Sequence, residues 1–224
     1  MKRWWVREYL SLPFATGRIF STDSWYVMSA MRAICQLPGP IVTFFGGREA
    51  YHEGKYAIWA TTLAQECVRN GLAVLSGGGP GIMAAANCGA RQAVRQQGDK
   101  RIWTLGICVG GVDLDFRNTC APTVTVPYFF MRKWFLMSYA SAIVVLPGGI
   151  GTLDELFELL NLIKARKQAD IPVILMGVSY WHSLLEWYKH AVDYELIKED
   201  YGHMLHTTDD LAEVIALLKS KVKQ

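Results

Sequence analysis

The sequence has little of what marks a disulfide scaffold, a metal centre or a membrane span. Its five cysteines include no C-x-x-C pair and its five histidines no H-E-x-x-H spacing, so we expect reduced thiols, no disulfide framework and no metal. Its apolar runs stay far below the roughly 20 residues that cross a bilayer. No apolar run of secretory type follows the basic N-terminus, so we expect a cytoplasmic protein with no membrane partner.

A strong excess of one charge is also missing. The 23 Lys and Arg residues against 20 Asp and Glu residues leave a formal net charge of +3. That charge is too small to indicate a nucleic-acid partner, but it would not repel a phosphorylated small molecule. With 224 residues, 51% of them apolar, the chain can bury a large core and fits one large α/β domain better than two small ones.

What the sequence does contain is a regular alternation of two kinds of segment. From Ile41 onward, short β-rich runs alternate with longer runs of helical periodicity. This alternation predicts an α/β fold of the Rossmann-like, doubly wound type, with a mostly parallel sheet and helices on both faces. The predicted strands cover residues 41–45, 72–76, 102–108, 123–126, 142–146 and 171–176. The predicted helices cover residues 55–70, 80–97, 130–139, 152–165, 181–192 and 209–219.

The first part of the chain differs from the rest. Residues 1–38 contain no clear strand and lead into the breaker series Leu37-Pro38-Gly39-Pro40. We therefore predict an N-terminal helical extension over residues 1–38 and a Rossmann-like nucleotide-binding catalytic domain over residues 39–224.

A glycine-rich turn follows the predicted strand 142–146 and opens an amphipathic helix. Its sequence is Pro147-Gly148-Gly149-Ile150-Gly151-Thr152. Glycines allow a tight turn that brings backbone N–H groups against an anion, and the helix N-terminus adds unpaired donors and partial positive charge. Gly148, Gly149, Gly151 and Thr152 are therefore candidate phosphate-binding residues. A tight turn without a ligand remains the alternative, and the Thr152 hydroxyl could equally cap the helix.

Two more glycine runs follow predicted strands. Gly46 and Gly47 follow the first, while Gly78, Gly79 and Gly81 follow the second. Ligands bind outside the carboxyl ends of parallel strands, so these loops outline a nucleotide-sized crevice with the first turn. The sequence has neither a G-x-G-x-x-G run with an acidic residue about 20 positions on nor a Walker motif. We therefore expect a mononucleotide rather than a dinucleotide.

Four charged residues are candidates for the chemistry. Glu155 and Glu158 lie one turn apart on the helix that follows the 147–152 turn, where a carboxylate could stabilise positive charge on a ribose ring or orient water. Arg132 and Lys133 follow an aromatic run and could bind a phosphate, a base edge or a catalytic carboxylate. The alternatives are helix-dipole stabilisation by the glutamates and a surface pair of basic residues.

These motifs together resemble the Lonely Guy family of nucleoside 5′-monophosphate phosphoribohydrolases, many of whose members were once labelled possible lysine decarboxylases. The resemblance runs from about Ile41 to Val214 and its most specific motif is P-G-G-x-G-T-x-x-E, from Pro147 to Glu155. It implies that Arg132 and Glu155 are the catalytic pair. It also implies a homodimer with active sites near the subunit contact, no metal and no organic cofactor.

Some positions depart from the family pattern. Gly47 stands where serine is common, Ala84 where glutamate is common, and Phe130 where histidine is common in an M-H-x-R-K run. We therefore expect hydrolysis of a nucleoside 5′-monophosphate of AMP-like or cytokinin type, and the resemblance to the broader bacterial branch favours AMP-like or other ordinary nucleotides. The alternative is a non-catalytic nucleotide or phosphorylated-cofactor carrier, since fold alone does not determine function. Pyridoxal-dependent lysine decarboxylation would need a lysine in a Schiff-base setting, which the sequence does not show.

Overall fold

The computed structural model describes residues 24–49, 54–111, 117–197 and 204–222. Within them, seven strands form one sheet in which every neighbouring pair is parallel. The strands are β1 (Ile41–Phe45), β2 (Ala73–Ser76), β3 (Thr104–Val109), β4 (Thr123–Val126), β5 (Ala140–Val145), β6 (Val173–Met176) and β7 (Leu205–Thr208). The helices are α3 (Ser24–Cys35), α4 (Lys55–Arg69), α5 (Ile82–Gln97), α6 (Phe129–Ser138), α7 (Ile150–Lys164), α8 (Val178–Asp193) and α9 (Leu211–Val222).

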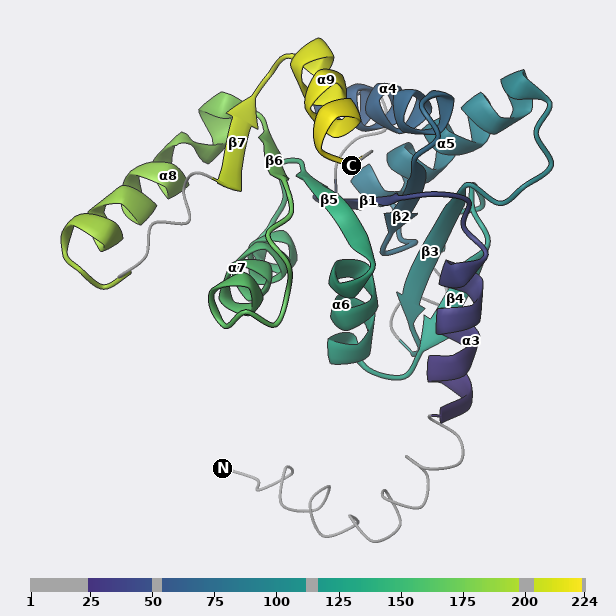
Figure 1. Ribbon diagram of the computed structural model, residues 1–224, viewed down its shortest axis with the longest axis horizontal. Helices are drawn as coiled ribbons and strands as arrows, with labels where there is room; N and C mark the ends of the chain where they lie inside the picture. The colour runs from purple at the N-terminus through teal and green to yellow at the C-terminus, as the bar shows by residue number, and fades with distance from the viewer. Residues whose placement is uncertain (1–23, 50–53, 112–116, 198–203, 223–224) are drawn as a thin grey trace, which may run out of the picture.

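The strand order is β4-β3-β2-β1-β5-β6-β7, so the chain builds one half of the sheet outward from β1 and then returns to build the other half. Helix α6 leads from the edge strand β4 back to β5, which pairs directly with β1 (Figure 1). The point at which the order reverses is where open parallel sheets bind their ligands. The fold therefore places the candidate site at the carboxyl ends of β1 and β5.

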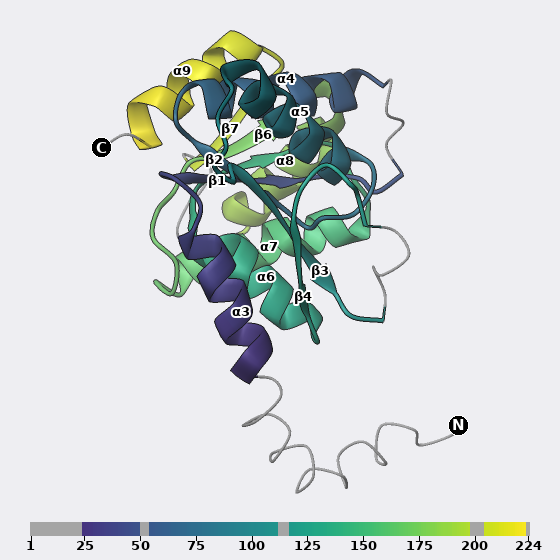
Figure 2. The same cartoon turned by 90° about the vertical axis from the view of Figure 1, so that its right-hand side faces the viewer.

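Helices cover both faces of the sheet. Helices α4, α5 and α9 lie on one face, and α3, α6 and α7 lie on the other (Figures 1 and 2). Helix α8 lies beside the edge strand β7 (Figure 1). The central strands are buried on both sides because both faces are covered, which explains their near-continuous apolar sequences. The predicted Rossmann-like, doubly wound fold is confirmed.

The predicted elements agree with the structure apart from one strand and a few boundaries. The short strand β7 was not predicted, because its sequence LHTT has a single apolar residue and is only partly buried. Helix α7 begins at Ile150, two residues before the predicted start. Helix α3 confirms helical structure for residues 24–35, and residues 1–23 of the predicted extension lie outside the described part. Among the described residues, no helix is both long and apolar enough to cross a bilayer.

The expectation of reduced thiols is wrong for one pair of cysteines. Cys88 of α5 and Cys120, just before β4, form a disulfide with their Cα atoms 4.8 Å apart. Cys35, Cys67 and Cys108 do not take part in a disulfide. The paired cysteines are 32 residues apart in the sequence, and they meet because the chain returns beside α5 before it enters β4. Scattered spacing therefore did not reveal the pair.

Candidate functional site

A cavity of about 700 Å³ lies at the carboxyl ends of β1 and β5. Its size is in the range of small-molecule sites. The structure brings together at this cavity most of the candidate residues from the sequence: Gly46, Gly47, Arg132, Lys133, Gly148, Gly149, Gly151, Thr152 and Glu155. Four other candidates lie outside its lining: Gly78, Gly79, Gly81 and Glu158.

We call residues 148–151 the 148–151 loop; they lead from β5 into α7 and include the first two residues of that helix. Gly149 is the N-cap, so its missing side chain leaves the start of the helix without a side-chain cap, and Thr152 lies inside the first turn with its side chain buried. A Cβ atom on Gly149 or Gly151 would meet no heavy atom within 4 Å. The first amides of a helix have no intrahelical acceptor. This loop therefore presents open backbone donors, and the positive end of the α7 dipole, beside the cavity.

Residues 77–81, the 77–81 loop, connect β2 to α5 and are closely packed against other backbone. Gly78 has φ +70° and its hypothetical Cβ would lie 2.8 Å from the Cys108 sulfur. Gly81 has φ +65°, and a Cβ there would collide with the carbonyl oxygens of Gly47 and Arg48. The Ile82 amide donates to the Gly47 carbonyl at 3.1 Å. These glycines serve a left-handed backbone and close contact with the loop after β1, rather than an open surface.

Arg132 of α6 and Glu155 of α7 face each other across the cavity wall. Arg132 Nη2 and Glu155 Oε1 are 3.8 Å apart, and the two side chains are 13% and 14% exposed. The same nitrogen lies 3.6 Å from the Met83 sulfur. A Cβ on Gly77 would collide with the Arg132 guanidinium, so a larger residue at position 77 would force this side chain to shift. The 77–81 loop thus shapes the cavity through Arg132.

Burial controls the protonation of Glu155. It raises the pKa of this carboxyl from the ordinary 4.5 to about 7 because the charged form loses hydration. The positive charge of Arg132 acts in the opposite direction and favours the ionised form. A carboxyl with a pKa near neutrality can exchange protons efficiently at physiological pH.

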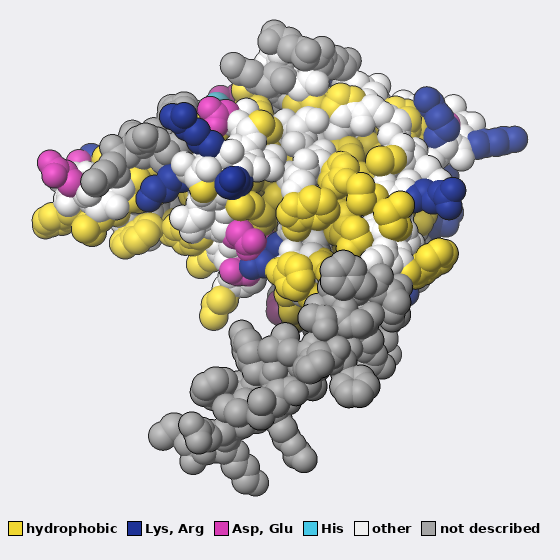
Figure 3. Space-filling view, turned by 60° about the horizontal axis from the view of Figure 1, so that its bottom comes forward, with side chains coloured by type: hydrophobic (Ala, Val, Ile, Leu, Met, Phe, Trp, Pro, Cys, Tyr) yellow, Lys and Arg dark blue, Asp and Glu magenta, His cyan; other side chains and the backbone are white. Residues whose placement is uncertain are grey.

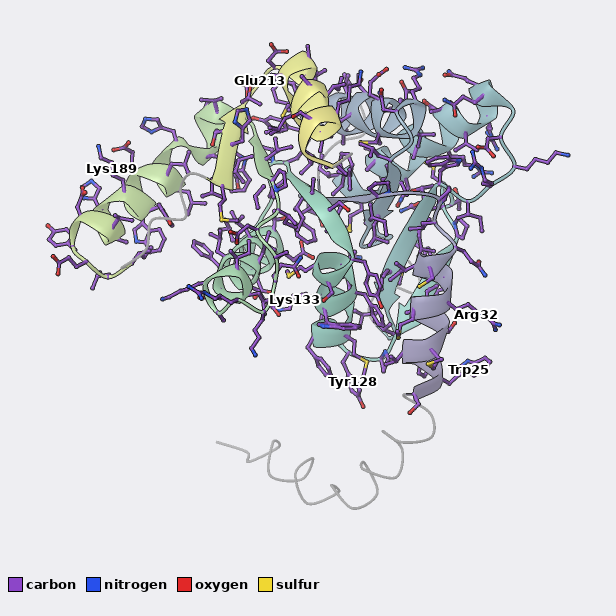
Figure 4. The ribbon with its side chains drawn as sticks, in the orientation of Figure 1. Trp25, Arg32, Tyr128, Lys133, Lys189 and Glu213 are labelled. Atoms are coloured by element: carbon purple, nitrogen blue, oxygen red, sulfur yellow. A yellow bond between two sulfur atoms is a disulfide. The ribbon has the colours of Figure 1, made fainter. Side chains whose placement is uncertain are left out.

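Lys133 is engaged with α7 rather than with open space. Its ammonium pairs with Asp154 Oδ2 at 3.1 Å and also with the Glu158 carboxylate. Burial by itself would lower the pKa of Lys133. The hydrogen bonds to Glu158 and Asp154 together outweigh burial, so the net effect is a raised pKa. Lys133 lies between α6 and α7 (Figure 4). This network fixes the two helices that carry Arg132 and Glu155 relative to each other.

Several residues of the site were missed from the sequence. Tyr180, at the start of α8, lines the cavity and its hydroxyl donates to the Gly148 carbonyl. Tyr56, Met83 and Phe129 supply apolar surface to the lining. Arg48 also lines it, although the sequence motif that contains Arg48 had suggested only its glycines. Tyr180 could have been found only by knowing that β6 lies next to β5, because nothing near it in the sequence marks a site.

The described residues offer no evident metal centre, since they include no group of three His, Cys, Asp or Glu side chains that could hold an ion. The cavity offers backbone amides, the guanidinium groups of Arg48 and Arg132, and the buried Glu155 carboxyl. These groups suit an anionic ligand whose reacting bond lies beside the Glu155 carboxyl.

Comparison with known proteins agrees with this geometry. The chain is 28% identical to a cytokinin riboside 5′-monophosphate phosphoribohydrolase of Arabidopsis thaliana, over 87% of this chain and 80% of that protein. It is 26% identical to a pyrimidine/purine nucleotide 5′-monophosphate nucleosidase of Escherichia coli (strain K12), over 92% of this chain but only 45% of that protein.

Solved structures share the fold. The molybdenum cofactor binding protein of the phototrophic bacterium Rippkaea orientalis superposes with a TM-score of 0.60 at 22% identity, covering 81% of this chain and 96% of that one. The molybdenum cofactor carrier protein of Chlamydomonas reinhardtii gives 0.59 at 20% identity, covering 83% and 99%. Residues 73–218 match the family model described as possible lysine decarboxylase. Because that match covers more than half of the chain, the protein belongs to this family, the one that the Lonely Guy motifs indicate.

Proposed function

We propose that the protein hydrolyses the N-glycosidic bond of a nucleoside 5′-monophosphate, with AMP-like nucleotides as the expected substrates, and releases free base and ribose 5-phosphate. The observation that carries this proposal is the pairing of Arg132 with Glu155 in a cavity that also contains the first turn of α7. Donors for an anion and a buried carboxyl thus share one ligand-sized space.

The 5′-phosphate binds to the 148–151 loop in this proposal. Gly149 and Gly151 have open space where a side chain would be, so phosphate oxygens can approach their amides closely. The α7 dipole favours a negative charge there. Tyr180 holds the Gly148 carbonyl from the other side and keeps the loop in a donor-presenting conformation.

The ribose then lies against Glu155, which follows the 148–151 loop by one helical turn. As the bond between C1′ and the base nitrogen breaks, positive charge develops on the sugar ring, and the Glu155 carboxylate stabilises it. Water attacks C1′, the bonding electron pair leaves with the base, and the Glu155 carboxylate accepts the proton of the attacking water. This proton then passes to the departing base nitrogen, which gives the free base and regenerates the carboxylate. Arg132 favours the ionised carboxylate that this step requires.

The remaining candidates have supporting roles in the proposal. Lys133 and Glu158 hold α6 against α7, while Gly78, Gly79 and Gly81 allow the close packing of the 77–81 loop against Cys108, Met83 and the loop after β1. Gly46 and Gly47 keep the floor of the cavity free of side chains. Tyr56, Met83 and Phe129 provide the apolar surface on which a base can stack.

The test is a panel of purine and pyrimidine nucleoside 5′-monophosphates incubated with the protein, followed by detection of free base and ribose 5-phosphate. Release from at least one nucleotide supports hydrolysis. Tight binding without release would instead support a carrier function. A Glu155→Gln variant should bind the same nucleotide and release little base, because its side chain cannot accept the proton of water.

We also propose a homodimer in which α6 contributes to the contact. Phe129, Phe130 and Trp134 of this helix are 53%, 61% and 46% exposed. Hydrophobic side chains gather on this side of the molecule (Figure 3), and exposed apolar patches of this kind mark interaction surfaces. Light scattering after gel filtration should give twice the chain mass of 25.2 kDa for the parent protein. The Phe130→Arg variant should give the mass of one chain.

A further inference from the structure

The 77–81 loop is held from outside the cavity by Asn118. Its side-chain amide donates to the Gly79 carbonyl at 3.0 Å and to Asn87 Oδ1 at 3.0 Å. Its backbone amide donates to the Gly78 carbonyl at 2.9 Å. The position of Asn118 therefore fixes the conformation of the loop between β2 and α5.

The disulfide lies directly beside this contact. Cys88 follows Asn87 in α5, and Cys120 lies two residues after Asn118, whose side-chain oxygen accepts a hydrogen bond from the Cys120 amide at 3.1 Å. The covalent bond thus connects the two chain segments whose asparagines are hydrogen-bonded to each other. Besides the disulfide, Arg91 attaches residues 118–120 to α5, because its side chain donates a hydrogen bond to the Thr119 carbonyl.

The bond can be reached by a small thiol. Both cysteines are partly exposed, and Cys120 lines a second cavity of about 360 Å³. Arg91 and Arg101 also line this cavity, so their positive charges favour the approach of an anionic thiolate. Thiol–disulfide exchange requires both access and a thiolate near the bond.

A change in the 77–81 loop would reach the Arg132–Glu155 pair through direct contacts. Gly77, at the start of the loop, lies against the Arg132 guanidinium. Met83, two residues beyond the loop in α5, contacts the same guanidinium. Arg132 in turn is 3.8 Å from the Glu155 carboxylate. A displaced loop would therefore alter the position of Arg132 and the pairing that holds Glu155.

We propose that the Cys88–Cys120 disulfide is a reversible modification site for low-molecular-weight thiols, and that its oxidised form locks the 77–81 loop through Asn118. A thiolate attacks the Cys120 sulfur, the S–S bond breaks, and Cys88 leaves as a thiolate that takes up a proton. A second thiolate attacks the mixed disulfide, which releases Cys120 as a thiol and the reagent as its own disulfide. Two electrons pass from the reagent to the protein.

The test compares oxidised and dithiothreitol-reduced full-length protein by amide hydrogen exchange, in a Cys35→Ser background that removes an exposed free thiol. We expect exchange at Gly78 and Ile82 to be roughly tenfold faster after reduction, with β6 and β7 unchanged. The Cys88→Ser/Cys120→Ser variant should match the reduced protein and should not respond to the reagent. Unchanged exchange in the loop, or equal acceleration across β6 and β7, would overturn the proposal.

Asn118→Ala with the disulfide intact tests the route. It should accelerate exchange in the 77–81 loop as reduction does, and reduction should then add little, because both changes release the same contact. If reduction and Asn118→Ala each accelerated exchange in full and their effects added, the disulfide would not act through Asn118. Affinity for a nucleoside monophosphate should fall in parallel. That readout rests on the proposed function, but hydrogen exchange does not, so the two proposals fail separately.

Discussion

The 77–81 loop and the 148–151 loop have similar glycine-rich sequences and both join a strand to a helix, yet the structure uses their glycines differently. In the 77–81 loop a Cβ atom would strike protein at every glycine. In the 148–151 loop only Gly148 is packed in this way, against Thr152 and the Gly47 amide, while Gly149 and Gly151 face open space. In the 77–81 loop, glycine is needed for close packing within the protein. At Gly149 and Gly151, glycine leaves space for a ligand to approach.

The comparison shows that a glycine-rich turn after a strand predicts its own backbone shape better than it predicts a ligand. Two glycines with positive φ, Gly78 and Gly81, lie in the loop that is packed. Residues 148–151 include no positive φ, and this loop lies at the helix start beside the cavity. The space around each glycine, rather than the number of glycines, therefore distinguishes a binding loop from a packing loop.

The largest expected effect concerns the carboxyl that the 148–151 loop places in the cavity. Glu155→Gln should lower the rate of base release roughly a thousandfold, about 4 kcal/mol in the activation free energy, because the amide can neither accept a proton nor balance a positive sugar. Single-turnover release of base measures this. Glu158→Gln is the matched control one turn later, outside the cavity lining, and should lose less than about tenfold. Equal losses would remove the distinction between the two carboxylates.

The next effect separates the two loops by stability. Gly81→Ala should lower the free energy of unfolding by about 3 kcal/mol or more, because it forces a side chain into a positive φ and against the carbonyls of Gly47 and Arg48. Gly151→Ala, in open space within the first turn of α7, should leave stability unchanged or slightly raised and weaken nucleotide binding. Urea unfolding of both variants tests this. Similar losses of stability would contradict the difference between the loops.

A third effect follows from the raised pKa of Glu155. The folded protein retains a proton up to about pH 7, whereas the unfolded chain loses it near pH 4.5, so this group contributes stability below pH 4.5 that is lost as the pH rises to 7. Glu155→Gln should therefore be more stable than the parent above pH 7, by about 1 to 3 kcal/mol. At pH 4.5 the two should be nearly equal. A constant difference across this range would show that burial of the charge is not its cause.

The smallest effect concerns the outer support of the 148–151 loop. Tyr180→Phe removes the hydrogen bond to the Gly148 carbonyl and should cost about 1 kcal/mol in nucleotide binding, or about fivefold in the dissociation constant. Isothermal titration with an unhydrolysed nucleotide measures this. His182→Ala, two residues further on α8, is not part of the cavity lining and is the control. An unchanged dissociation constant in Tyr180→Phe would mean that the loop keeps its shape without this contact.

Much of the fold could be predicted from the sequence because buried parallel strands are apolar throughout and the helices between them are amphipathic. That pattern located β1 at both ends, and alternating Thr and Val located the edge strand β4. It failed at β7, an edge strand with one apolar residue among its four. The meeting of Arg132 with Glu155 had been inferred from family motifs, since 22 intervening residues separate them along the chain.

What the sequence could not show depends on contacts between distant segments. Tyr180 reaches Gly148 only because β6 lies beside β5, and Cys88 reaches Cys120 only because the chain returns to α5 before β4. Lys133 was a candidate for binding a phosphate, a base edge or a catalytic carboxylate, and in the structure Asp154 and Glu158 of α7 hold its ammonium. Local pattern carries no information about such partners.

The most direct test of the central claim is the change in backbone amide chemical shifts when a nucleoside 5′-monophosphate is added to the Glu155→Gln variant, which would bind the nucleotide without hydrolysing it. The account predicts large shifts at Gly149 and Gly151, little change at Gly78 and Gly81, and much smaller shifts with the parent nucleoside, which has no phosphate. Large shifts at Gly78 and Gly81, with Gly149 and Gly151 unchanged, would contradict it.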